Sequence, residues 1–275
     1  MSQPTIAAAL RAAAEALEPV SETARLDAEL LMAEAAGITR SDLVTRFMQE
    51  PPPAGFAALL ARRMTHEPVA YILGRQEFYG REFIVSPATL IPRPDSETLI
   101  DAALHLPQAQ GRVLDLGTGT GALLLTVLAE KGGEGWGTDR SAEALVVARR
   151  NAAALGLESR ASLLLADWSR PGWADAIPPC DLVLCNPPYV ESDAPLARDV
   201  AAFEPHGALF AGPQGLDDYR LLAPQLRGLL AQGGAAIFEI GHQQADAVAA
   251  LFAAEGFASR LCRDLAGRPR ALVLT

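Results

Sequence analysis

An apolar strand opens into alternating glycines at Val113-Leu114-Asp115-Leu116-Gly117-Thr118-Gly119-Thr120-Gly121-Ala122. A helical run follows directly, from Leu123 to Glu130. Glycine permits positive φ and lets a ligand approach the main chain closely, while the N-terminus of a helix favours negative charge such as a carboxylate. The stretch therefore predicts a loop that binds a small ligand.

The spacing of these glycines narrows the kind of ligand. Dinucleotide sites seat a pyrophosphate with Gly-x-Gly-x-x-Gly, whereas this loop has Gly-x-Gly-x-Gly. Asp115, just before the glycines, would repel a pyrophosphate but can accept a hydrogen bond from an ammonium group. The loop therefore favours a cofactor that carries an amino acid over NAD, and it disfavours a hydride-transferring dehydrogenase.

The two strands that follow the glycine loop also end in acidic residues. The first, residues 134–138, ends at Asp139, about 20 residues after the glycines, where doubly wound folds bind ribose hydroxyls. The second, residues 161–165, is followed by Asp167 and Trp168, which supply an acid and a flat ring. Either acid alone is more often a helix cap than a ligand contact. In series at the carboxyl ends of strands, where open α/β sheets bind ligands, they predict a binding site.

A fourth strand, residues 181–185, ends in Asn186-Pro187-Pro188-Tyr189. Two prolines cannot continue a sheet ladder, so the backbone leaves the strand and presents its carbonyls outward. The Asn186 side-chain oxygen and the Pro187 carbonyl can together accept both hydrogens of a planar –NH2 group, and Tyr189 offers a flat face. A plain strand-terminating turn is the alternative for this motif taken alone.

In this order, the glycine loop, Asp139, Asp167-Trp168 and the Asn-Pro-Pro-Tyr corner resemble class I S-adenosylmethionine-dependent methyltransferases acting on planar nitrogen. More narrowly, the chain resembles the peptide chain release factor glutamine methyltransferases, the PrmC/HemK family. The supporting segments span most of the chain and are Glu67-Pro68-Val69-Ala70-Tyr71-Ile72-Leu73-Gly74, Glu77-Phe78-Tyr79-Gly80, Leu90-Ile91-Pro92-Arg93-Pro94, Phe203-Glu204-Pro205 and Phe238-Glu239-Ile240-Gly241-His242-Gln243.

The resemblance implies a reaction: transfer of a methyl group from S-adenosylmethionine to the side-chain amide nitrogen of the glutamine in the Gly-Gly-Gln loop of release factors. It also implies roles for particular residues. The catalytic residues would be Asn186, Pro187 and Tyr189, and these three with Pro188 would bind the substrate. The cofactor-binding residues would be Gly117, Thr118, Gly119, Thr120, Gly121, Asp139 on the ribose, Trp168 beside the adenine, and Asn186.

One segment departs from the family pattern. Where the family usually follows Arg-Pro with Glu-Thr-Glu, this chain has Asp95-Ser96-Glu97. The first acid is one methylene shorter, so any contact that it makes would have a different reach. We therefore leave Asp95 out of the predicted site.

The predicted fold class is α/β, a Rossmann-like, mostly parallel seven-stranded sheet with an antiparallel edge strand. Strands and helices alternate after residue 110, which predicts a parallel sheet covered on both faces. Before the sheet, leucines at helical spacing predict a small all-helical domain with N-caps at Ser21 and Ser41 and a C-cap at Gly37. A linking β-hairpin is predicted over residues 76–85, with Gly80 in its middle.

Three domains follow from this organisation. Residues 1–75 form a helical substrate-recognition domain, by the family resemblance, residues 76–94 a β-hairpin and linker, and residues 95–275 the methyltransferase domain that binds S-adenosylmethionine. The strands near residues 258–262 and 270–274 are close enough in sequence to form a terminal hairpin, which would supply the antiparallel strand.

Composition and charge limit the partners. The chain has 275 residues, 50% of them apolar, and a net charge of −10, with 33 acidic residues against 23 basic ones. A protein that binds naked nucleic acid normally carries a stripe of basic residues, so the acidic charge of this chain fits a protein substrate better. No apolar run predicts a membrane span or a secretory segment, so we expect a cytoplasmic monomer. The 3 cysteines and 4 histidines lack ligand spacing, and no metal is implied.

Two further alternatives stay open from the residues. The Asn-Pro-Pro-Tyr corner also suits methylation of an exocyclic amine of adenine in DNA or of guanine in ribosomal RNA, since these are planar –NH2 groups. A cofactor-binding regulator without activity is the other, and an intact Asn186 motif argues against it. Because no histidine or carboxylate adjoins the motif in sequence, we predict that the amide proton leaves after methyl transfer, to water or to an acceptor outside the motif.

Overall fold

The computed structural model describes residues 4–275, which form two compact units. The first consists of the chain up to Arg75 together with Leu196–Phe203. The second consists of Gln76–Pro195 and Glu204–Thr275, so the linking hairpin belongs to the same unit as the sheet. Within residues 4–275, every helix is too short or too polar to span a bilayer.

The first unit is built from short helices around an apolar core. Its fully buried side chains include Leu10, Leu17, Leu31 and Leu43, leucines at the helical spacing that the sequence predicts, and also Met32. The helical elements are α1 (Ile6–Leu17), α2 (Ala24–Ala36), α3 (Arg40–Asp42), the π-helical turn η1 (Leu43–Phe47), α4 (Phe56–Met64), α5 (Val69–Leu73) and α9 (Arg198–Phe203).

The ends of these helices confirm one predicted cap and correct two. Gly37 ends α2 with φ +66°, as predicted. The predicted N-caps Ser21 and Ser41 are wrong, because α2 begins after Thr23, and Thr39 caps α3 by accepting from the Asp42 N–H at 3.0 Å. In both cases the observed N-cap lies two residues from the predicted one and is also a hydroxyl residue, a difference that sequence patterns do not resolve.

The second unit opens with the predicted hairpin, a two-stranded sheet of β1 (Arg75–Phe78) and β2 (Arg81–Ile84). The main sheet follows and has seven strands in the order β5-β4-β3-β6-β7-β9-β8. In chain order these strands are β3 (Arg112–Leu116), β4 (Glu134–Asp139), β5 (Ala161–Leu165), β6 (Cys180–Cys185), β7 (Leu230–Glu239), β8 (Ser259–Arg263) and β9 (Pro269–Leu274).

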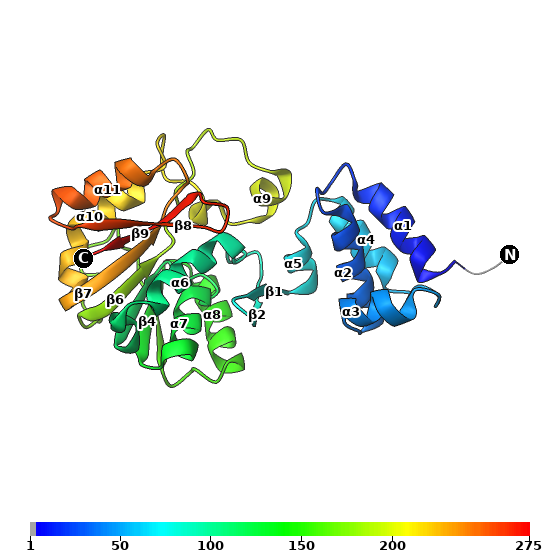
Figure 1. Cartoon of the computed structure of the whole chain (residues 1–275), viewed down its shortest axis with the longest axis horizontal. Helices are drawn as coiled ribbons and strands as arrows, with labels where there is room; N and C mark the ends of the chain where they lie inside the picture. Colours follow the sequence, from blue (N-terminus) through cyan, green and yellow to red (C-terminus); the bar gives the residue numbers. More distant parts are fainter. Residues whose placement is uncertain (1–3) are drawn as a thin grey trace. The chain divides into compact units, whose positions relative to one another are not determined.

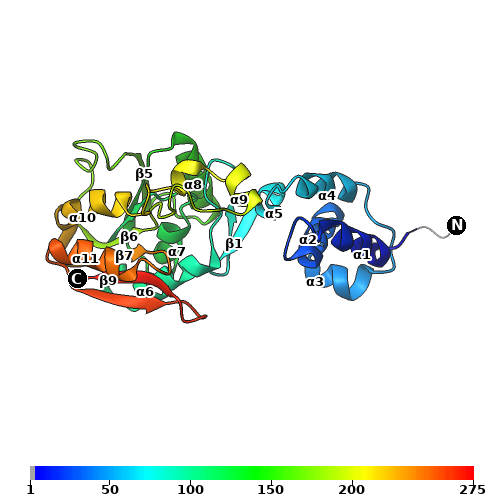
Figure 2. The same ribbon diagram turned by 90° about the horizontal axis from the view of Figure 1, so that it is seen from above.

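Helices cover both faces of this sheet, and each face has its own apolar core (Figure 1). One core packs beneath α6, α7 and α8, and the other beneath α10 and α11, which lie side by side in both ribbon views (Figure 2). The helices are α6 (Glu97–Leu104), α7 (Ala122–Lys131), α8 (Ala142–Ala154), α10 (Asp217–Leu229) and α11 (Ala245–Ala254), with single 3-10 turns at η2 (Pro94–Ser96), η3 (Pro107–Gln110) and η4 (His206–Ala208).

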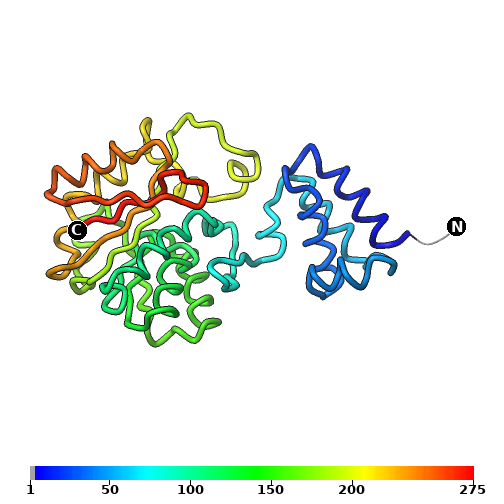
Figure 3. The backbone as a smooth tube through the Cα atoms, viewed as in Figure 1, coloured from blue at the N-terminus to red at the C-terminus, as the bar shows by residue number. Residues whose placement is uncertain are grey.

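The predicted fold class is confirmed, with one refinement to the antiparallel strand. β9 pairs antiparallel with β7 on one side and with β8 on the other, so it lies one position inside the sheet. The edge strand is β8, and Figure 3 shows its trace alongside that of β9, which leads to the C-terminus. Either arm of a terminal hairpin can join β7, and the sequence does not say which one does.

The strand order places the predicted site. The chain proceeds from β3 outward through β4 to β5, and then returns to β6 on the other side of β3. In open α/β sheets this reversal leaves a crevice at the carboxyl ends of the two central strands, where ligands bind. The glycine loop follows β3, and Asn186 follows β6, so both predicted motifs border the crevice.

Candidate active site

A cavity of about 320 Å³ lies at the carboxyl ends of β3, β4 and β6. This volume is in the range of small-molecule sites. The cavity brings together residues that four separate parts of the sequence predicted. Of the predicted site residues, those that line it are Gly117, Gly119, Asp139, Trp168, Asn186 and Pro188.

The glycine loop is shaped by backbone that only glycine adopts easily. Gly117, Gly119 and Gly121 have φ of +71°, +54° and +84°. A Cβ on Gly117 would lie 3.2 Å from Cη2 of Trp168, so a side chain there would press on the ring that lines the cavity. Gly121 begins α7 as its N-cap. The loop therefore exposes main chain to the cavity, as the sequence predicts.

Asp139 connects the end of β4 to this loop. Its Oδ2 accepts from the Gly119 N–H at 2.9 Å, and its Oδ1 accepts from the Ser141 N–H at 2.8 Å. A carboxylate has about four acceptor positions, so lone pairs remain for a ligand hydroxyl. The same side chain thus fastens the loop and lines the cavity.

The two threonines of the loop do not line the cavity, and their hydroxyl groups form hydrogen bonds that stabilise the loop. Thr118 is buried and donates from Oγ1 to Asp115 Oδ2 at 2.6 Å, while Thr120 Oγ1 accepts from the Ala122 N–H at 3.3 Å. Neither Thr118, Thr120 nor Gly121 lines the cavity, so their predicted part in cofactor binding stays a prediction.

Asp115 is buried beneath the loop, with 1% of its surface exposed. Burial raises the pKa of its carboxyl to about 7, against the opposing effect of the Thr118 hydrogen bond. Its Oδ1 has no hydrogen-bond partner among residues 4–275. Asp115 does not line the cavity, so the predicted contact of its carboxylate with an ammonium group stays a prediction.

Trp168 and Asp167 form the wall that follows β5. The Trp168 Nε1 donates to Asp218 Oδ1 at 2.8 Å, which fixes the plane of the ring. Asp167 accepts from the hydroxyl of Ser169 at 2.7 Å and from its N–H at 2.9 Å, and these bonds lower the pKa of the carboxyl. The cavity is therefore bounded here by a fixed aromatic face and an ionised acid.

The residues of the Asn-Pro-Pro-Tyr corner lie partly at the cavity and partly against the core. Asn186 and Pro188 line the cavity, whereas Pro187 is buried and the ring of Tyr189 packs against the core beside α10 and α11. The Tyr189 hydroxyl donates to Glu239 Oε1 at 3.2 Å. The predicted substrate contacts of Pro187 and Tyr189 therefore stay predictions, and Tyr189 has a clear role in holding the corner.

Part of the cavity wall was not predicted. Residues 87–90 line it from one side and Pro205, Gly207 and Ala208 from another. The two sides are tied together because the Arg93 guanidinium donates to the buried carboxylate of Glu204, which also accepts from the Ile91 N–H at 3.2 Å. Both segments carry motifs of the family resemblance, and this was the available signal for them.

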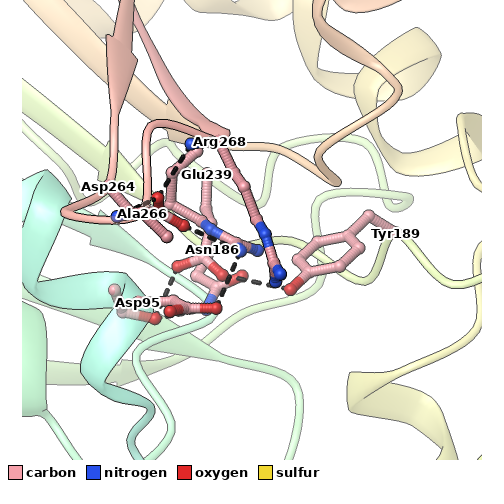
Figure 4. Close-up of polar contacts among 9 residues, drawn as sticks. Asp95, Asn186, Tyr189, Glu239, Asp264, Ala266 and Arg268 are labelled. Carbon is pink, nitrogen blue, oxygen red and sulfur yellow. Dashed lines mark hydrogen bonds and ion pairs between the residues drawn. The ribbon is translucent and has the colours of Figure 1, made fainter.

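A polar cluster lies behind the corner (Figure 4). Ser96 donates to Glu239 Oε2 at 2.6 Å, and Asn186 Nδ2 donates to Ser96 Oγ at 3.4 Å. Beside them, Arg270 pairs with Asp95 at 2.8 Å and with Asp264 at 3.3 Å. The shortened acid Asp95 therefore reaches Arg270 and does not line the cavity. No role was predicted for Ser96 or Glu239, although both lie in segments compared with the family pattern.

The chain matches known families over most of its length. Residues 8–74 match the family described as PrmC N-terminal domain, and residues 95–203 the family described as Methyltransferase small domain. Among solved structures, a methyltransferase from Pyrococcus furiosus superposes with a TM-score of 0.52 at 15% identity, covering 79% of this chain and 98% of that one. This last likeness concerns the fold alone.

Relatives of higher identity narrow the family. The chain is 46% identical over 272 residues to the release factor glutamine methyltransferase of Cereibacter sphaeroides, with 95% of each chain covered. It is 41% identical over 257 residues to the release factor glutamine methyltransferase of Caulobacter vibrioides, with 90% of this chain and 88% of the other covered. The chain therefore belongs to the family of release factor glutamine methyltransferases.

Proposed function

We propose that this protein transfers a methyl group from S-adenosylmethionine to the side-chain amide nitrogen of a glutamine in peptide chain release factors. One observation carries the proposal. Asn186 borders a cavity beside the glycine loop, with its amide nitrogen turned to Ser96 and its oxygen left for a ligand. Family membership supports the same reaction, and the resemblance points to the glutamine of the Gly-Gly-Gln loop.

The residues around the cavity fit S-adenosylmethionine. Gly117 and Gly119 line the cavity and would hold its methionine part with their main chain, and Asp139 would accept from the ribose hydroxyls. Trp168 would lie beside the adenine. When bound, S-adenosylmethionine supplies an electrophilic methyl group.

The protein has to orient the glutamine amide nitrogen that receives the methyl group. The nitrogen of a carboxamide is a poor nucleophile, because its lone pair is delocalised into the carbonyl group. Acceptance of both N–H bonds, by the Asn186 oxygen and the Pro187 carbonyl, would draw electron density onto the nitrogen and fix its direction. Positioning of this kind contributes roughly 7–11 kcal/mol in favourable cases.

The amide proton leaves after the nitrogen has been methylated, to water or to an acceptor outside the corner. Glu239 is the carboxylate nearest to the motif through hydrogen bonds, but it is 1% exposed and does not line the cavity. It therefore has no direct path to the substrate nitrogen. The helical domain, residues 1–75, would hold the release factor, and the net charge of −10 disfavours naked nucleic acid.

The test uses isotope-labelled S-adenosylmethionine with a release factor, and the same factor with its loop glutamine replaced. Label is expected in the first factor and absent from the second. Label in DNA or ribosomal RNA, with none in the factor, would overturn the proposal in favour of methylation of a base amine. Asn186→Ala should lower turnover about a hundredfold or more. Calorimetric binding of S-adenosylhomocysteine by this variant should largely persist, because the glycine loop is a separate contact.

A further inference from the structure

Glu239 is a buried carboxylate placed directly behind the Asn-Pro-Pro-Tyr corner. It ends β7, and both of its oxygens accept hydrogen bonds. Oε2 accepts from the Ser96 hydroxyl at 2.6 Å, and Oε1 accepts from the Tyr189 hydroxyl at 3.2 Å. Figure 4 shows Glu239 beside Asn186 and Tyr189, which come from a different strand end. A buried acid with no contact to the cavity requires a role other than ligand binding.

The donors and acceptors of this chain of bonds can be counted. A serine hydroxyl has one proton, and Ser96 gives it to Glu239. Towards Asn186 the same oxygen can therefore only accept, so it requires a donor there. That donor is Nδ2 of Asn186, 3.4 Å away. The ionised carboxylate thus determines which end of the Asn186 amide faces Ser96, and the Oδ1 end must face the other way.

We infer that Glu239 is a positioning residue that acts through Ser96 to keep the Asn186 amide turned with Oδ1 towards the substrate –NH2 group. The inference rests on the proposed function, in which Asn186 accepts from the substrate amide. A reversed Asn186 would present an –NH2 group to an –NH2 group, leaving donors without acceptors. The carboxylate is therefore needed for the direction of the hydrogen bonds, and an apolar side chain of similar size, which has no acceptor for the Ser96 hydroxyl, would not replace it.

Protonation of Glu239 would remove this constraint. A protonated carboxyl can donate to Ser96, whose own proton can then turn to Asn186 and stabilise the reversed amide. Burial raises the pKa of Glu239 to about 7, against the hydrogen bonds from Ser96 and Tyr189 and the charge of Arg270. The charged and titratable groups around it are Asp95, Cys185, Tyr189, Tyr219 and Arg270. Turnover should therefore rise with pH through about pH 7.

The experiment compares turnover and cofactor binding in matched variants between about pH 6 and about pH 9. Glu239→Met, which removes both acceptor oxygens, and Ser96→Ala should lower kcat about tenfold or more and lose the rise near neutral pH. Ser96→Thr keeps a hydroxyl and should keep kcat within about threefold of the wild type, as should Asp246→Asn, which removes an exposed carboxylate of α11 outside this cluster. Binding of S-adenosylhomocysteine should be unchanged in all four.

A readout independent of turnover is the side-chain amide NMR signal of Asn186. In the wild type it should shift with pH in step with the Glu239 carboxyl resonance, and in Ser96→Ala it should not. Full kcat in folded Glu239→Met and Ser96→Ala overturns the inference, as does an Asn186 signal that does not change with pH. Equal losses in Ser96→Ala and Ser96→Thr would also overturn it. If the wild type labels no release factor, the proposed function fails, and the NMR titration still tests the orientation of Asn186.

Discussion

The guanidinium of Arg93 binds the carboxylate of Glu204 across 111 positions of the sequence, and this pair joins two walls of the cavity. The Glu204 side chain is 1% exposed, whereas that of Arg93 is 37% exposed. Glu204 also accepts from the Ile91 N–H. The loop that precedes α6 is therefore held in place by an acid that lies far away in the sequence.

Glu204→Ala should loosen this wall. It removes the acceptor of the Ile91 N–H and the partner of Arg93, which can partly hydrate, so we expect a loss of about 1–3 kcal/mol in the free energy of unfolding. The dissociation constant for S-adenosylhomocysteine should rise about tenfold. Urea unfolding and calorimetry measure the two effects. Glu255→Ala, at an exposed glutamate after α11, is the control and should change neither.

Asp139→Asn should weaken cofactor binding through the glycine loop. An asparagine has one acceptor oxygen, so it cannot serve the N–H groups of Gly119 and Ser141 as the two carboxylate oxygens do. We expect about a tenfold rise in the dissociation constant for S-adenosylhomocysteine. Glu143→Gln is a matched control, because Glu143 is an exposed acid on the same cavity wall. Equal effects in both variants would argue against a special role for Asp139.

Gly117→Ala should affect binding as well as stability. The new methyl group would lie 3.2 Å from the Trp168 ring, and the residue would have to keep φ near +71°. Gly156 has a similar φ of +67° and open space around its Cβ position. Both alanine variants should therefore lose about 1–2 kcal/mol of stability, since both strain the backbone. Only Gly117→Ala should lose affinity for S-adenosylhomocysteine, and a comparable loss in Gly156→Ala would contradict this account.

The buried Asp115 should make stability depend on pH. Its pKa is about 7 in the folded protein, above the ordinary value of 3.8, so the folded state binds the proton more tightly than the unfolded state. The free energy of unfolding should therefore fall, by on the order of 4 kcal/mol at most, as pH rises from about 4 to about 7. Above about pH 7 this contribution should stay level.

Asp115→Asn removes this titration and keeps an acceptor for Thr118. Its stability relative to the wild type should increase as pH rises over the same interval, measured by urea unfolding at several pH values. Asp246→Asn, at an exposed aspartate in α11, serves as the control for the loss of one charge. A difference between wild type and Asp115→Asn that stays constant with pH would mean that the carboxyl titrates normally.

Much of the sheet could be predicted because its signals are local. The apolar run at residues 161–165 became β5 without change, and the glycine loop lies where β3 ends, because strand composition and glycine act within a few residues. The position of β9 could not be predicted in the same way. It depends on which arm of a hairpin pairs with β7, and both arms have the residues of a strand.

The candidate site shows the same division. Asp139, Trp168 and Asn186 follow strands and carry chemical groups that suit a ligand, so their place at the cavity was predictable. Ser96 and Glu239 are separated by 143 positions, and although each lies in a segment compared with the family, nothing in the sequence pairs one with the other. Contacts of this kind arise only when the fold brings distant strand ends together, and a single sequence does not contain that information.

Because β9 lies between β7 and β8, the final strand is a structural part of the sheet and cannot be removed without damage. Deletion of Pro269–Leu274 would open a gap between β7 and β8, leave β8 with no neighbour in the sheet, and remove Arg270 from Asp95. Shortening this end of the chain would therefore weaken the polar cluster behind the Asn-Pro-Pro-Tyr corner, although the deleted residues lie outside the cavity.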